Sequence, residues 1–149
     1  MRLLKERGQA MVEFAIVMPV LLIFILGIAQ FALIINAYSI VNYAAFCACR
    51  SGVVYNADDS KMKMAASIVC TPISGNAINS FLKTSVNKEL IQKKGTIPVN
   101  NLKVTVINYY KLVFPVVGKL FNIFWGGIKI NGSVHIPIKA TCIMRMENR

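Results

Sequence analysis

A long stretch without any charge dominates the N-terminal third of this chain. No Asp, Glu, Lys, Arg or His occurs between Glu13 and Arg50, and residues 14–35 are apolar apart from Gln30. At about 1.5 Å per residue, a helix of these residues is roughly 33 Å long, which is enough to cross the hydrocarbon core of a bilayer. We therefore predict one transmembrane helix over about residues 14–36.

The charges that flank this stretch predict its orientation. Arg2, Lys5 and Arg7 outweigh Glu6 in residues 1–8, and basic flanks remain on the cytoplasmic side of a membrane. We expect a single-pass protein of the cytoplasmic (inner) membrane, with residues 56–149 forming an extracytoplasmic domain. A cleaved secretory signal fits less well, because its apolar region has only about 7–15 residues and is followed promptly by a small-residue cleavage site.

Glu13 lies at the edge of the apolar stretch. A carboxylate is costly there unless a partner compensates its charge, so an acid at this place is a functional candidate. The alternative is that its side chain simply reaches the lipid headgroups.

Helical patterning continues beyond the expected membrane segment. Residues 36–55 contain no proline, so one helix is expected over about residues 9–55. Its outer part has a stripe of small residues at Ala44, Ala48 and Gly52, which permits close packing against either the chain's own domain or another subunit. After a break at residues 56–60, helical spacing predicts a helix over 61–70 that ends at Thr71 and Pro72, and an amphipathic helix over about 76–93.

The period changes to two in the last third. Alternation over residues 102–107 and 133–146 predicts strands, with another short extended piece over 128–131. Residues 114–127 are apolar with glycines, which we interpret as a loop or short helix against the sheet or the membrane surface. The fold class expected is α+β, with the long N-terminal helix packed against a small antiparallel sheet.

The chain offers no constellation that predicts enzyme activity. The remaining acids are scattered, and no metal, nucleotide or nucleophile motif occurs, so no cofactor, metal or catalytic residue is expected. The four cysteines allow three pairings; a disulfide between Cys70 and Cys142 is conceivable, but buried free thiols are the simpler interpretation. From residue 9 onward the chain has 14 basic and 5 acidic residues. This excess of positive charge is expected either to form a solvated basic surface or to bind anionic polymers and lipids. Nucleic acid is not expected as a partner.

The N-terminal segment resembles the prepilins of type IV pilus systems, and within them the TadE-like minor pilins (pseudopilins) of tight-adherence pili. The resemblance rests on Gly8, on Glu13 with Phe14, and on a set of apolar and small residues that follow: Ala15, Val17, Pro19, Leu21, Leu22, Gly27, Phe31, Ala44 and Ala45, with Arg50. A weaker second match covers Val104–Val106, Phe114 with Pro115, and the final strand.

The resemblance implies how the chain is processed and assembled. A membrane prepilin peptidase would cut between Gly8 and Gln9, and Glu13 would then pair with the N-terminal amine of a neighbouring subunit. Pro19 and Gly27 would lie in the helix-packing surface. The implied partners are the peptidase, other major and minor pilins, and the pilus assembly platform in the membrane. The alternative is an unprocessed, signal-anchored envelope protein whose basic domain binds a surface polymer or a membrane complex.

Overall fold

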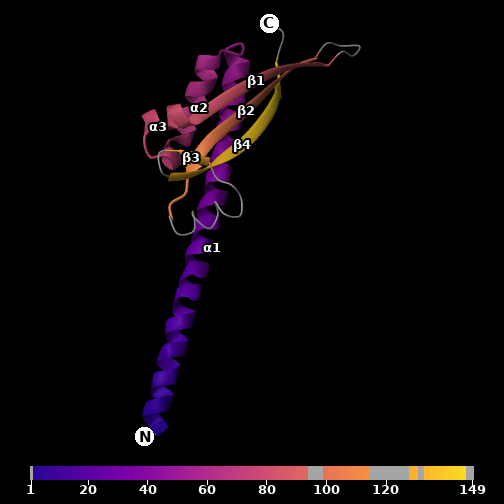
Figure 1. Cartoon of the computed structure of the whole chain (residues 1–149). Coiled ribbons are helices and arrows are strands. Elements are labelled where there is room, and N and C mark those ends of the chain that lie inside the picture. The colour runs from indigo at the N-terminus through magenta and orange to yellow at the C-terminus, as the bar shows by residue number, and fades with distance from the viewer. Residues whose placement is uncertain (1, 94–98, 115–127, 131–132, 147–149) are drawn as a thin grey trace.

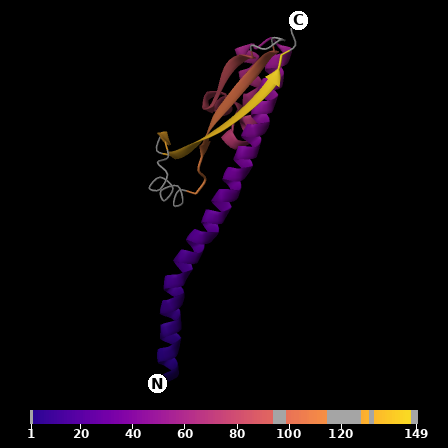
Figure 2. The same cartoon turned by 90° about the vertical axis from the view of Figure 1, so that its right-hand side faces the viewer.

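The computed structural model describes residues 2–93, 99–114, 128–130 and 133–146. A single continuous helix, α1 (Arg2–Val54), forms the axis of the molecule. The remaining elements gather beside its C-terminal half, while its N-terminal half projects alone (Figure 1). Figure 2 shows that α1 also bends along its length. The prediction of one long apolar N-terminal helix is confirmed.

Two shorter helices follow a tight turn. Asn56 and Ala57 both adopt positive φ, at 53° and 60°, which reverses the chain into α2 (Asp59–Ser74). The prediction that α2 ends at Thr71 and Pro72 was short by one turn: the helix passes Pro72 and ends at Ser74, and Gly75, whose φ is 83°, caps it. Proline is tolerated there because only one backbone hydrogen bond is lost, close to the helix end.

The region expected as one amphipathic helix over 76–93 is divided between two structures. Only Ala77–Lys83 is helical (α3), and Thr84–Lys93 is a strand, β1. This part of the prediction was wrong because Val86 and Leu90, four residues apart, fit a helical spacing but also lie on one face of a strand. Pairing with a neighbouring strand then decides the outcome, since strand preference depends strongly on tertiary context.

The described strands form one antiparallel sheet in the order β1-β2-β4-β3. β2 (Val99–Lys111) lies between β1 and β4 (Ser133–Arg145), and the short β3 (Ile128–Ile130) lies at the far edge. The alternation over 102–107 and 133–146 therefore predicted real strands. The sequence expectation for residues 115–127 lies outside the described residues.

The core lies where one face of the sheet meets α1 and α2. Val106 is opposite Val86 on one side and Ala140 on the other, and Leu102 and Val104 lie on the same face. These side chains pack against the small residues of α1 and against Met62 and Ala66 of α2. The expected α+β fold, with a long helix packed against a small antiparallel sheet, is confirmed.

Candidate assembly interface

The N-terminal half of α1 is an apolar surface that the described domain leaves uncovered. Every side chain from Gln9 to Ile25 is exposed, including Met11 at 77% and Phe24 at 70%. A soluble monomer rarely exposes a continuous apolar surface of this extent. α1 is also the one described helix that is long and apolar enough to cross a membrane. This half of α1 therefore has to be covered by lipid, by other helices, or first by lipid and later by other helices.

The residues singled out at the start of the chain all lie on this projecting helix. Gly8 and Gln9 are within α1 rather than in a separate leader structure. Glu13 is four residues after Gln9, so the two lie on the same face about one turn apart. Phe14 is 65% exposed and free to contact a neighbouring subunit. The structure thus presents these residues on one accessible helix.

Pro19 and Gly27 also lie on the uncovered half. Proline supplies no backbone N–H, so the Ala15 carbonyl loses its helical partner although α1 continues through Pro19. At Gly27 an added Cβ would meet nothing within 4 Å. A closely approaching helix is therefore not hindered by this domain at either position.

The stripe of small residues has a different environment. Ala44 and Ala48 are fully buried in the domain core. A Cβ on Gly52 would lie 2.5 Å from Leu102 Cδ2 and 2.6 Å from Met62 Sδ. The sequence left open whether this stripe serves the chain's own domain or another subunit; the structure places it against β2 and α2 of the same chain.

A contact between Gln30 and Phe114 was not foreseen from the sequence. The backbone N–H of Phe114 donates to Gln30 Oε1 over 3.1 Å, and the Gln30 side chain is fully buried. Gln30 is the first residue of α1, from Gln9 onward, that the domain buries. The available signal was the amide itself, the lone polar side chain in residues 14–35.

The four cysteines are all free thiols in this structure, including Cys70 and Cys142. Cys142 lies beside Cys49, whose Sγ is 3.6 Å from the Leu102 carbonyl oxygen and 3.7 Å from that of Cys142. Burial, assisted by the Cys142 thiol, raises the pKa of Cys49 to about 12. Burial also raises the pKa of Cys70. Both buried thiols are therefore kept protonated and unreactive.

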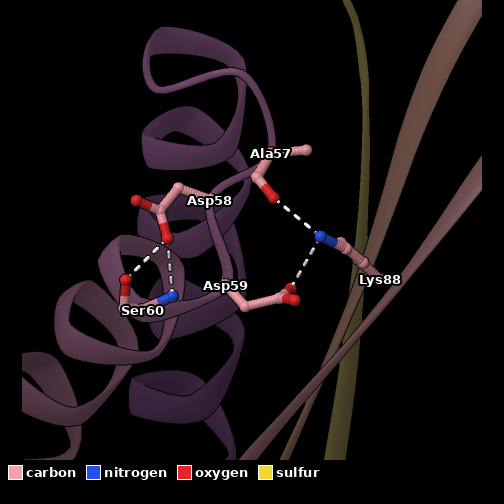
Figure 3. Close-up of polar contacts among 5 residues, drawn as sticks. All are labelled: Ala57, Asp58, Asp59, Ser60 and Lys88. Atoms are coloured by element: carbon pink, nitrogen blue, oxygen red, sulfur yellow. Dashed lines mark hydrogen bonds and ion pairs between the residues drawn. The ribbon is translucent and has the colours of Figure 1, made fainter.

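The turn between α1 and α2 is fastened to the sheet by a lysine (Figure 3). Lys88 Nζ donates to the Ala57 carbonyl oxygen over 2.8 Å and lies 3.0 Å from Asp59 Oδ1. On the other side of the turn, Asp58 caps α2 by accepting hydrogen bonds from the Ser60 backbone N–H and hydroxyl. No cluster of metal-ligating side chains occurs among the described residues.

Comparison with known proteins gives one match, to the part of the chain that forms most of α1. Residues 8–50 match the family model described as TadE-like protein. No curated protein and no solved structure matches the chain. The matched segment begins at Gly8 and includes Glu13, Gln30 and Arg50. The N-terminal segment of this chain is therefore TadE-like, and with its long apolar helix it fits a pilin related to tight-adherence (Tad) pili.

Proposed function

We propose that this chain is a minor pilin, or pseudopilin, of a tight-adherence type IV pilus. α1 first anchors it in the cytoplasmic membrane with residues 1–8 in the cytoplasm and the domain outside. A prepilin peptidase then cuts between Gly8 and Gln9. The assembly platform transfers the subunit from lipid into an adhesive filament, where α1 packs against other major and minor pilins.

The observation that carries this proposal is the uncovered apolar half of α1 within a TadE-like segment. A helix that leaves lipid for a filament needs an apolar surface suited to both environments. The domain covers α1 only from about Gln30 onward, so the preceding residues are available for exchange between lipid and neighbouring helices. The chain also has a domain of α2, α3 and four described strands, which suits a specialised subunit better than a filament protein built mainly from one helix.

Glu13 provides the electrostatic part of assembly. Cleavage would create a positive amine on Gln9, and neither this amine nor the Glu13 carboxylate is well tolerated alone in hydrocarbon. Pairing the carboxylate with the amine of a subunit already in place would fix the axial register of each incoming helix.

The mature N-terminus is the decisive measurement. Mass spectrometry of the protein from cells that contain the peptidase should find a chain beginning at Gln9. Gly8→Ala should leave the leader attached, whereas Glu13→Ala should be cleaved normally but enter pili poorly. An intact leader on the unsubstituted protein would contradict the proposal and favour the unprocessed, signal-anchored envelope protein.

A further inference from the structure

We propose that Leu112–Phe114, directly after β2, seat the domain on the outer leaflet of the membrane, with Gln30 as their attachment point on α1. We call Leu112–Phe114 the foot segment. The exposed side of the foot segment contacts lipid at the boundary between the headgroups and the acyl chains. This inference rests on the proposed function only in requiring that α1 crosses a bilayer before assembly.

The height of the foot segment along α1 is the first observation. The Phe114 N–H donates to Gln30 Oε1, and Gln30 belongs to the uninterrupted helical stretch Gln9–Val54, which is long and apolar enough to cross a membrane. Beyond this height α1 still exposes large apolar side chains, at Ile35 (65%) and Tyr38 (52%). The foot segment therefore lies at a level where α1 itself is still apolar and uncovered.

The distances place this level at the membrane boundary. Gln30 precedes Tyr38 by eight residues, or about 12 Å along a helix. Residues 9–29 already provide a helix of about 31 Å, close to the thickness of a hydrocarbon core. The outer boundary of the hydrocarbon then falls near Gln30, and Tyr38 lies within the headgroup region where tyrosines concentrate. This inference takes the membrane segment to begin near Gln9 instead of at about residue 14, and Glu13 would then lie about one helical turn inside the bilayer.

The side chains of the foot segment fit this boundary. Leu112 is buried against the domain, and Val113 is 57% exposed. Lys111, directly before them, is exposed and can reach lipid phosphates. Lys111 followed by the apolar Leu112 and Val113 is the order expected for a chain that passes from water into this boundary.

Gln30 gains a specific role from this arrangement. A backbone N–H that enters an apolar environment needs an acceptor, because no water is available there. The Gln30 carboxamide supplies that acceptor from within the apolar helix. Its Nε2 is buried and has no hydrogen-bond partner among the described residues, so the side chain is positioned for the Phe114 N–H at the expense of its own donor.

The test uses single-tryptophan variants of the full chain. Trp125 is the only tryptophan, so the Trp125→Phe variant has no tryptophan fluorescence. Phe24→Trp, Val113→Trp or Ile143→Trp is then introduced into this variant as the single fluorophore. Ile143 is the matched control for Val113, because the two side chains are 56% and 57% exposed, but Ile143 lies on β4 opposite Lys103, far along β2 from the foot segment. Each variant is reconstituted into phosphatidylcholine vesicles with or without lipids brominated on their acyl chains.

We expect bromolipid to reduce the fluorescence of Phe24→Trp and Val113→Trp and to leave Ile143→Trp unchanged. Adding Gln30→Leu should weaken the quenching of Val113→Trp, whereas Gln30→Glu, which keeps an oxygen acceptor, should preserve it. Unchanged quenching in Gln30→Leu would overturn the role of Gln30.

The remaining outcomes separate the two proposals. If Phe24→Trp is quenched but Val113→Trp is not, the foot segment does not touch lipid and this inference is wrong. A blue-shifted but unquenched Val113→Trp would mean that protein, such as a second copy of the chain, covers the foot segment, which also overturns it. If Phe24→Trp itself is not quenched, α1 is not in the bilayer and the membrane stage of the proposed function fails as well.

Discussion

Lys88 joins the strand β1 to the turn that reverses the chain, with its Nζ 2.8 Å from the carbonyl oxygen of Ala57. The same nitrogen lies 3.0 Å from the Asp59 carboxylate. Ala57 has positive φ, a conformation that side chains with a Cβ adopt reluctantly. The lysine thus ties a strained turn to the sheet.

Replacing Lys88 by Met should destabilise the domain by about 1 kcal/mol, because a charge-assisted hydrogen bond is lost while the aliphatic stem remains. Thermal unfolding of the full chain in detergent measures the effect. Lys103→Met is the control, since Lys103 pairs only with the exposed Glu89 among the described residues and should cause a smaller decrease. Equal decreases in melting temperature for the two variants would show that the contact with Ala57 adds no stability beyond that of an exposed ion pair.

Ala57→Gly should stabilise the domain by about 0.5–1 kcal/mol. Glycine adopts positive φ without steric cost, which outweighs the greater freedom of the unfolded chain and the loss of one buried methyl group. Ala66→Gly in α2 is the matched control and should do the opposite, because Ala66 is buried within a regular helix. A lower melting temperature for Ala57→Gly would show that the turn is not strained.

Gly52→Ala should destabilise the domain by about 1–3 kcal/mol, because its Cβ would overlap Leu102 and Met62. Gly27→Ala should not lower the melting temperature, since nothing lies within 4 Å of an added Cβ. If Gly27 lies in the filament packing surface, Gly27→Ala should instead reduce the amount of the subunit in purified pili. A tolerated Gly52→Ala would contradict the tight packing of α1 on β2.

Alkylation should distinguish the thiols. In native protein at pH 8, iodoacetamide should label the half-buried Cys47 and spare Cys49 and Cys70. The pKa of Cys49 is about 12, so its thiolate is scarce and its labelling should remain slow well above pH 9. Peptide mass spectrometry after timed labelling gives the result, and denatured protein is the control. Rapid labelling of Cys49 would show that β4 separates readily from α1.

Acid should weaken the domain through Asp58 and Glu89. Hydrogen bonds from Ser60 hold the pKa of Asp58 below its usual 3.8, and Lys103 lowers the pKa of Glu89 below 4.5. A carboxylate with a depressed folded pKa contributes stability above its unfolded pKa, which is lost as pH falls through the folded value. The melting temperature should therefore fall below about pH 4.5, and less steeply in Asp58→Asn with Glu89→Gln. An identical slope in this double variant would assign the acid sensitivity to other groups.

Local patterns were sufficient where the residues left a single structural solution. The period-two runs of β2 and β4 allow only strands with one buried face, and Asn56 with its neighbours marks the end of α1. In Thr84–Lys93 two periods were compatible, and the helix was chosen. Hydrogen bonding to Val99–Asn108 resolved that ambiguity, and such pairing between distant segments has no local signal.

The candidate interface divides in the same way. Glu13 was singled out by its charge at the edge of the apolar stretch, and the resemblance to TadE-like proteins added Gly8, Gln9 and Phe14 as candidates; the roles proposed for all four depend only on one helix and a bilayer. The environment of Gly52 could not be identified, since a small residue permits close approach without specifying its partner. Gln30 was noticed as the lone amide, but its partner Phe114 is 84 positions away.

The sequence by itself determined that the residues between Glu13 and Arg50 include a long, uncharged helix that water cannot accommodate uncovered, because hydrophobicity depends on composition and not on neighbours. It also determined the α+β class, since the helical spacing of apolar residues and the period-two alternation of strands can both be recognised in consecutive residues. Only the tertiary structure decided that Thr84–Lys93 is a strand, that Ala44, Ala48 and Gly52 face their own sheet, and that Gln30 meets Phe114. Those outcomes depend on which distant surfaces come together, and many pairings satisfy the same local pattern.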